Sequence, residues 1–257
     1  MEGKMTQFIL AVVVLLACLF GTDVYAQANQ TDVVPTSEGD LKMTLIGHGS
    51  LMFEHGEKII HVDPWTKVGD YASLPKADLV LITHHHSDHL DTVALEQIKK
   101  DNTITVMPPK CAEKIKNLYE SSPILMTNGD KKTLYGFLIE AIPAYNLVHM
   151  RDNGVPFHPK GEGNGYIITF GDKRIYVAGD TENTGEMKAL KNIDAAFIPM
   201  NLPYTMDSAM AADAVKAFKP KLVYPYHTTS NEEDQVPGFI ELMKGFAEVT
   251  IRNMKIK

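Results

Sequence analysis

The six-residue run HHHSDH at positions 84–89 constrains the fold of this chain more than any other segment. Its four histidines would repel one another if protonated, and their polar edges would go unsatisfied if they were buried without a partner. A bound cation removes both problems, because neutral imidazole and carboxylate are natural metal ligands. The run follows the apolar segment 77–83 and precedes the helix-like segment 92–99, so it lies in a strand-to-helix loop. A metal site explains this run better than a solvated polar turn does.

The spacing within the run predicts two metal positions. Residues two apart in an extended segment point the same way, so His84 and His86 can share one ion while His85 faces away. Asp88 and His89 lie beyond the bend of the loop and can serve a second ion. A lone His-x-His pair is weak evidence for a metal site, but the longer pattern directly after a buried strand is specific evidence for one.

The rest of the chain alternates between hairpins and strand–helix units. Residues 41–62 are expected to form a hairpin that ends at Asp63, and residues 166–178 a second hairpin that ends at Asp180. Strand–helix alternation follows each hairpin, and a later strand ends at His227. No linker separates the two halves. The pattern therefore predicts one α/β (α+β) domain with two sheets covered by helices on their outer faces.

Several histidines outside the run have roles that the sequence leaves open. His48 lies between two glycines, where it can contact substrate or a metal-bound water, or serve only in backbone packing. His61 is expected on the exposed face of a strand. Residues 145–165 have no periodicity and are expected to form a long ordered loop, which carries His149 and His158.

The N-terminal segment is expected to direct export. Lys4 precedes an apolar run over residues 8–20, and small residues favour cleavage of a signal peptide, residues 1–26, after Ala26. The protein is then periplasmic or secreted. The alternative is a lipoprotein lipidated at Cys18, the one case in which stable membrane association is expected. Residues 27–40 are polar and are expected to form a flexible lead-in.

Composition limits the partners of the chain. Its 257 residues, 44% of them hydrophobic, can bury a sizeable core. The formal net charge of -7 argues against a nucleic-acid partner, since phosphate binding needs a basic surface. The expected partner is a small-molecule substrate. Cleavage of the leader leaves Cys111 alone, so no internal disulfide can form, and this thiol is expected to be a small core residue. The sequence does not determine the oligomeric state.

In their order and spacing these motifs resemble the metallo-β-lactamase superfamily. The matching motifs are, in order, Asp63 after a strand, the run at 84–89, GDT at 179–181 and His227 at a strand end. The resemblance covers residues 41–257, which are expected to form one hydrolase domain of that type. The resemblance implies a four-layer αββα sandwich with metal ions at one edge between the sheets.

The same resemblance implies a set of site residues. His84 and His86 would hold the first ion, Asp88, His89 and His227 the second, and Asp180 would bridge the two. Asp63 would orient a ligand by a hydrogen bond. Asp88 or Asp180 can also accept a proton, and His48 is a further catalytic candidate. The motif GHGS at 47–50 is similar to the branch of ascorbate-phosphate lactonase and N-acyl-phosphatidylethanolamine phospholipase D, more than to true β-lactamases.

One position departs from the pattern of the superfamily. Relatives usually place another first-site histidine after a Pro-Ala pair, but here the segment 143–145 leads to Asn146. His158 can supply the missing ligand from the loop, or His149 can do so. Otherwise Asn146 or water fills the position and the first site binds its ion more weakly.

The function implied is that of an exported, metal-dependent hydrolase. Its cofactor is expected to be zinc, as two ions, although manganese or iron would fit the same ligands. A metal-bound hydroxide would cleave an ester, lactone or phosphodiester bond. The alternatives are an iron-dependent redox enzyme on the same scaffold and a metal-binding protein without turnover.

Overall fold

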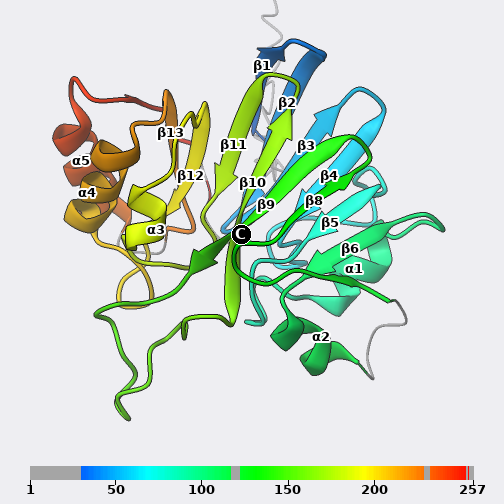
Figure 1. The fold of residues 1–257 in the computed structure, drawn as a ribbon, viewed down its shortest axis with the longest axis horizontal. Helices are drawn as coiled ribbons and strands as arrows, with labels where there is room; N and C mark the ends of the chain where they lie inside the picture. The colour runs from blue at the N-terminus through cyan, green and yellow to red at the C-terminus, as the bar shows by residue number, and fades with distance from the viewer. Residues whose placement is uncertain (1–29, 117–121, 229–231, 253, 255–257) are drawn as a thin grey trace, which may run out of the picture.

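The structure is a computed structural model, which describes residues 30–116, 122–228, 232–252 and 254. Within this part of the chain two sheets of seven strands pack face to face, with helices on the outer face of each (Figure 1). The predicted signal peptide, residues 1–26, and the lipoprotein alternative at Cys18 lie outside the described residues. No helix in the described ranges is both long and apolar enough to cross a bilayer.

The first sheet begins with an antiparallel meander and continues with parallel strands. Its order is β1 (Gln30–Thr36), β2 (Gly39–Gly47), β3 (Ser50–His55), β4 (Lys58–Val62), β5 (Leu79–Leu81), β6 (Ile104–Met107) and β7 (Ile124–Leu125). Pairing is antiparallel from β1 to β4 and parallel from β4 to β7. The antiparallel part needs only short turns, whereas the parallel part needs crossover connections, which carry the loops discussed below.

The second sheet repeats this plan. Its strands are β8 (Lys131–Leu134), β9 (Phe137–Ala144), β10 (Gly163–Phe170), β11 (Lys173–Val177), β12 (Ala195–Pro199), β13 (Leu222–Tyr226) and β14 (Glu248–Val249). Pairing is antiparallel from β8 to β11 and parallel from β11 to β14. Because both sheets change from antiparallel to parallel pairing at their centres, the crossover loops of both halves can meet at one edge.

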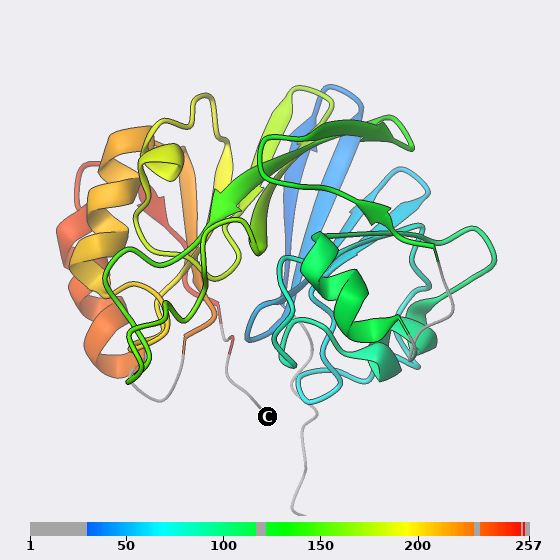
Figure 2. The same cartoon turned by 60° about the horizontal axis from the view of Figure 1, so that its bottom comes forward.

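Helices close the two outer faces (Figure 2). The first sheet is covered by α1 (Thr92–Ile98) and α2 (Pro109–Ile115), and the second by α3 (Gly185–Lys188), α4 (Ser208–Phe218) and α5 (Glu232–Met243). One apolar cluster fills the space between the sheets, and one lies under each helical layer. The predicted four-layer αββα sandwich is confirmed. Cys111 is buried in the helical layer of the first sheet, as expected.

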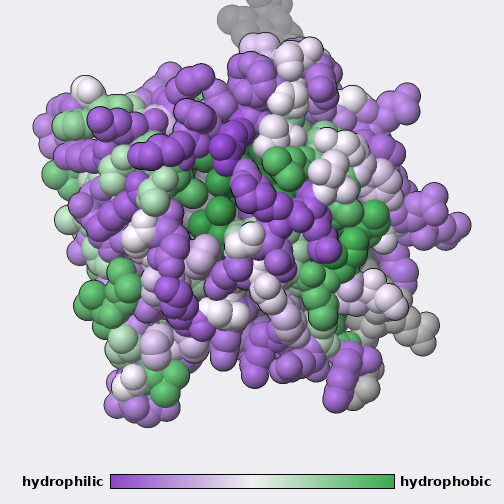
Figure 3. Space-filling view, in the orientation of Figure 1, coloured by the Kyte–Doolittle hydropathy of each residue, from purple (hydrophilic) through white to green (hydrophobic). Residues whose placement is uncertain are grey.

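Most of the face seen in Figure 3 is hydrophilic, with hydrophobic residues in small groups. One such group lies on the loop that projects at the lower left of Figures 1 and 3. This loop connects β9 to β10, and it carries Val148, Met150 and Val155 as exposed apolar side chains.

The prediction of a flexible lead-in over residues 27–40 is wrong for the part that is described. Gln30–Thr36 is an edge strand paired with β2 along its whole length, with alternating half-buried and exposed residues. Asp32 also accepts hydrogen bonds from Tyr224 at 2.8 Å and from Arg252 at 2.5 Å. Polar composition indicated disorder, but edge strands carry polar residues because one side faces water.

The expectation for His61 is also wrong, because its side chain is fully buried. The segment between β4 and β5 covers it: Nε2 lies 3.0 Å from the carbonyl oxygen of Pro75, and the ring lies 5.9 Å from that of Tyr71. Burial lowers the pKa of His61 to about 4, although the bond to Pro75 opposes this. The imidazole is therefore neutral in the folded protein at neutral pH.

This burial predicts a pH dependence of stability. Between pH 6.5 and about 4 the unfolded chain binds a proton at His61 and the folded chain does not, so stability falls as the pH falls. The contribution of this residue is about 3 kcal/mol, from about 1.4 kcal/mol for each pKa unit. His61→Gln keeps a donor for Pro75 but does not titrate, so its free energy of unfolding should decline less over this range. Urea unfolding at several pH values measures the difference; equal declines in both proteins would disprove the assignment.

Candidate metal centre

The histidines and aspartates predicted from the sequence meet at one edge of the sandwich, where strands of both sheets end. Asp63 directly follows β4, and Asp180 lies three residues after β11. The run at 84–89 lies in the loop after β5, and His227 directly follows β13. Carboxyl ends of parallel strands at a sheet edge are the usual place for ligand sites in α/β folds.

The first group of possible metal ligands consists of His84, His86, His158 and Asp180, with ligand atoms within 4.8 Å of one another. Nδ1 of His86 lies 3.1 Å from Nε2 of His84 and 3.2 Å from Nε2 of His158. Ligands at about 2.0–2.1 Å from a tetrahedral zinc ion are separated by about 3.3 Å. The three nitrogens therefore already have nearly the spacing that one ion requires.

The second group consists of His48, Asp88, His89 and His227, also within 4.8 Å. Nε2 of His89 lies 2.9 Å from Nε2 of His227. Oδ2 of Asp88 lies 3.1 Å from Nε2 of His48, 3.6 Å from that of His89 and 3.5 Å from that of His227. These atoms surround a second position suited to a cation.

Asp180 lies between the two groups and directs one oxygen at each. Oδ2 lies 3.2 Å from Nε2 of His158 and 3.8 Å from Nε2 of His84. Oδ1 lies 3.4 Å from Nε2 of both His89 and His227. Within the described residues Oδ1 is buried without a hydrogen-bond partner, which is costly for a carboxylate oxygen unless it binds a cation. The residues present therefore fit a pair of bridged metal ions.

The charges around His89 also call for a cation. Burial alone would lower its pKa, but Asp180, Asp88 and Asp63 outweigh burial and raise it to about 10. By contrast, burial and the neighbouring histidines lower the pKa of His86 to about 3. Without metal, a proton on His89 offsets part of the charge of these carboxylates. A metal ion supplies the same positive charge and leaves the imidazoles neutral, as ligands must be.

Asp63 belongs to neither group, but its hydrogen bonds orient one candidate ligand of each. Oδ1 accepts from the backbone N–H of Thr83 at 2.8 Å, and Oδ2 accepts from its hydroxyl at 2.6 Å. Oδ2 also lies 2.7 Å from Nδ1 of His89, and the Thr83 hydroxyl lies 3.0 Å from Nδ1 of His84. A proton on each Nδ1 satisfies all these contacts and leaves both Nε2 atoms free to bind metal. The predicted orienting role of Asp63 thus extends to His84 through Thr83, which sequence reasoning missed.

The loop after β9 brings His158, rather than His149, to the first group. The amide oxygen of Asn146 accepts from the backbone N–H of His158 at 2.8 Å and lies 2.7 Å from its Nδ1, which directs Nε2 at the metal position. The amide nitrogen of Asn146 donates to Glu182 at 2.8 Å and to the carbonyl of Tyr204 at 2.9 Å. Asn146 is therefore fully hydrogen-bonded and orients His158, a candidate metal ligand.

Glu182 anchors this loop. Its carboxylate accepts from the backbone N–H groups of Leu147 and Val148 at 2.7 Å and of His149 at 2.8 Å. Burial alone would raise the pKa of Glu182, but the hydrogen bonds from Asn146 and the backbone outweigh it and lower the pKa. Nδ1 of His149 lies 2.7 Å from the same carboxylate, so His149 belongs to neither metal group.

The turn between β2 and β3 places His48, and it adds a strand to the hairpin expected over residues 41–62. His48 has φ +50°, a strained conformation for a residue other than glycine. Its carbonyl accepts from the backbone N–H of His227 at 2.9 Å, which ties the turn to the end of β13. Its Nδ1 is buried without a partner among the described residues, whereas Nε2 faces Asp88. His48 therefore lies in the second group rather than apart from it.

An open pocket of about 520 Å³ adjoins both groups. Trp65, Phe157 and Tyr204 provide aromatic surface, and Lys114 and Arg151 are also part of its wall. Asn201 completes the support of the site, because its amide lies 3.1 Å from Nδ1 of His227. Asn201 follows a buried strand in the sequence, but its neighbour across the sheet cannot be read from that position.

Comparison with known proteins agrees with this geometry. Residues 42–227 match the family described as the beta-lactamase superfamily domain. A UPF0173 metal-dependent hydrolase of Nanoarchaeum equitans is 32% identical over 190 residues, which are 73% of this chain and 83% of the relative. A protein of Parabacteroides distasonis described as a metal-dependent hydrolase is 40% identical in its crystal structure, with a TM-score of 0.81 over 88% of this chain and 99% of that chain. A metallo hydrolase of Ignicoccus hospitalis is 26% identical, with a TM-score of 0.67 over 83% and 95%.

The loop geometry predicts different effects for its two histidines. His158→Ala should lose the ion of the first group, whereas His149→Ala should keep both ions. Asn146→Ala should weaken the first site by about 10–100-fold, because it removes the partner that orients a ligand. Metal content after dialysis and calorimetric zinc titration measure these effects. Loss of an ion from His149→Ala but not from His158→Ala would contradict the assignment.

The close approach of Gly49 to two ligands predicts that a methyl group there disturbs the second site. A Cβ at this position would lie 2.9 Å from Cε1 of His89 and 3.2 Å from Cδ2 of His227. Gly49→Ala should therefore weaken the binding of one zinc ion by about tenfold or more. Gly185→Ala is the matched control, because its Cβ would meet nothing within 4 Å. Equal zinc affinities in the two variants would refute the prediction.

Proposed function

The chain belongs to the metallo-β-lactamase superfamily and is a metal-dependent hydrolase, and from this premise we propose that it uses two zinc ions to cleave an ester, lactone or phosphodiester bond of a small molecule. The observation that carries the proposal is Asp180, whose two oxygens face the two ligand groups. A carboxylate placed in this way could serve both ions if they act together on one substrate.

The bound ions would supply an activated water and polarise the substrate oxygen. Asp88 is better placed than Asp180 to accept a proton, because 29% of its side chain is exposed, against 4% for Asp180. Nε2 of His48 lies 3.1 Å from Oδ2 of Asp88, so a hydrogen bond to this histidine can steady the carboxylate while it holds a proton. Asp63 and Thr83 keep the ligands oriented throughout, since both are fully buried.

Zinc is the proposed metal because imidazole and carboxylate together suit it, and the redox alternative requires iron on the same residues. Metal analysis of the protein purified from its own cells separates these functions. Two zinc ions per chain support hydrolysis, whereas two iron ions would favour the redox enzyme. A protein that binds zinc but hydrolyses no lactone, phosphodiester or β-lactam would favour binding without turnover.

Export is a separate part of the proposal. It rests on the composition of residues 1–26 and on the small residues before Gln27. N-terminal sequencing of the protein from cell fractions tests it: a periplasmic or secreted product that begins at Gln27 supports cleavage after Ala26. A lipidated product that begins at Cys18 would support the lipoprotein alternative instead.

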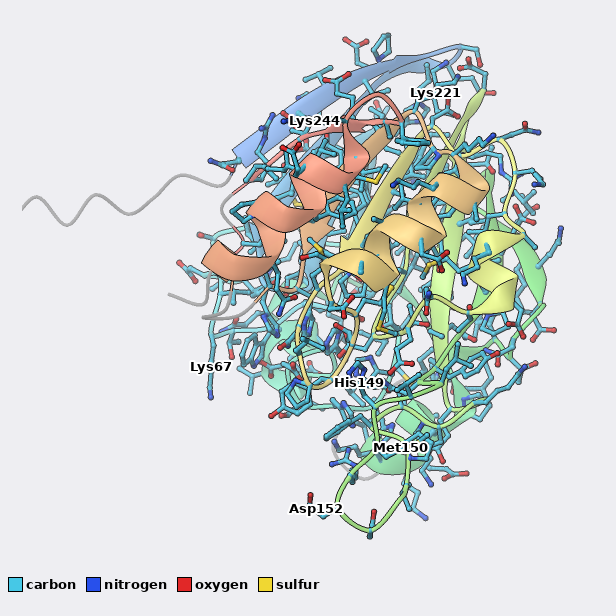
Figure 4. All side chains as sticks on the ribbon, turned by 90° about the vertical axis from the view of Figure 1, so that its left-hand side faces the viewer. Lys67, His149, Met150, Asp152, Lys221 and Lys244 are labelled. Atoms are coloured by element: carbon cyan, nitrogen blue, oxygen red, sulfur yellow. The ribbon has the colours of Figure 1, made fainter. Side chains whose placement is uncertain are left out.

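Replacement of the bridging carboxylate tests the hydrolytic mechanism. Asp180→Asn should lower the turnover of the best substrate by about 100-fold or more and should reduce zinc content, because it removes the ligand that both groups share. Asp152→Asn is the matched control, since Asp152 lies at the tip of the projecting loop (Figure 4). Full hydrolysis by both Asp180→Asn and His86→Ala would exclude this mechanism.

A further inference from the structure

The wall of the pocket has a charge pattern that hydrolysis alone does not require. Lys114 and Arg151 line it together with the metal-facing residues. Its lining carboxylates are Asp88 and Asp180, which belong to the two ligand groups. The charged residues of the wall that face no metal position are therefore both cationic, although the chain as a whole has a net charge of -7.

These two cations reach the pocket from different halves of the fold. Lys114 lies in the last turn of α2, which covers the first sheet, and donates to the carbonyl of His85. Arg151 lies on the loop after β9, which projects in Figure 4 beside the labelled His149, Met150 and Asp152. Its guanidinium lies 5.1 Å from the centre of the Phe157 ring and donates to the carbonyl of Phe157 at 3.4 Å.

Neither cation is paired with a carboxylate in the part of the chain that the structure describes. Other surface lysines of the same elements are paired: Lys110 of α2 lies 3.7 Å from Glu113, and Lys160 of the loop lies 2.8 Å from Glu186. An incoming anion therefore has no described ion pair to break at Lys114 or Arg151. A guanidinium can also bind an anion through two parallel hydrogen bonds, and an ammonium adds a point charge.

The same wall offers apolar surface beside the charges. The Phe157 and Tyr204 rings meet edge to face with centres 5.0 Å apart, and Trp65 lies 5.2 Å from the His48 ring. Tyr204 is 45% exposed, so this surface is open to a ligand. A pocket of about 520 Å³ lies within the range of small-molecule sites.

We propose that Lys114 and Arg151 form an anion subsite, and that the substrate is a small amphipathic molecule with a carboxylate or phosphate group remote from the bond that is cleaved. Its apolar body would lie against Trp65, Phe157 and Tyr204 while the reacting group faces the metal positions. The proposal rests on the proposed hydrolytic function, whose substrate class it narrows.

A binding experiment tests the subsite without turnover. Trp65 is the single tryptophan of the chain and lines the pocket, so its fluorescence reports ligand binding. Zinc-loaded protein is titrated with benzoate, with terephthalate and a longer aromatic diacid, and with para-phosphonobenzoate. The one carboxylate of benzoate can be bound at the metals, whereas the second anion of the other probes needs a subsite. At least one of these dianions should bind about tenfold more tightly than benzoate.

Substitutions show which residues produce the tighter binding of the dianions. Arg151→Gln and Lys114→Gln should each lose most of the gain, and Arg151→Lys should keep part of it. Lys110→Gln, one turn earlier in α2 and outside the pocket wall, removes the same charge and should keep all of it. A larger gain for the phosphonate than for the diacids would identify phosphate as the preferred group. No gain for any dianion, or an equal loss in Lys110→Gln, would overturn the subsite.

Two esters that differ only in one carboxylate distinguish a failure of the anion subsite from a failure of the proposed hydrolase function. With para-carboxyphenyl acetate and phenyl acetate, the subsite predicts a lower KM for the charged ester that rises in Arg151→Gln while kcat changes little. Hydrolysis of both esters with equal KM would leave the hydrolase intact and refute the subsite. Dianion binding without hydrolysis of any substrate would refute the hydrolase and keep the subsite.

Discussion

The structure of this site depends on one buried carboxylate, Asp63, at the end of β4. It accepts hydrogen bonds from the backbone N–H and the hydroxyl of Thr83 and contacts Nδ1 of His89, so it fixes the start of the loop that carries half of the candidate ligands. A buried carboxylate without hydrogen-bond partners would strongly destabilise the folded state. Conformations in which Thr83 or His89 moves away from Asp63 are therefore disfavoured. Through the Thr83 hydroxyl the same constraint reaches His84, so one side chain orients a ligand of each metal group.

Both halves of the fold contribute to the centre, and this links metal binding to the assembly of the sandwich. The first sheet supplies the run at 84–89 and the turn at His48, and the second supplies Asp180, His158 and His227. The backbone bond from His227 to the carbonyl of His48 joins the two at the site. Since ligands from both sheets converge only in the folded chain, the free energy of metal binding also stabilises the packing of one sheet on the other.

The sequence predicts candidate site residues where they form a local motif or follow a recognisable strand. The spacing within the run at 84–89 predicts its candidate ligands, and the resemblance to the superfamily implies Asp180 and His227. By contrast, the choice of His158 over His149 depends on Asn146 and Glu182, which lie 36 residues apart and meet only across the sheet edge. The burial of His61 depends on the loop that contains Pro75, and the order of residues 30–36 on pairing with β2. Contacts between residues far apart in the chain leave no local sequence pattern from which they could be predicted.

In the loop after β9, Asn146 orders the pocket wall as well as the candidate ligand His158. Glu182 holds the start of this loop by three consecutive backbone N–H groups, and Asn146 links that anchor to His158. Arg151 and Phe157 lie between the anchored start and the ligand, in the segment that the anchor confines. The segment that lines the pocket is thus tied at both ends, so the candidate ligand His158 and this part of the pocket wall are positioned by the same hydrogen bonds.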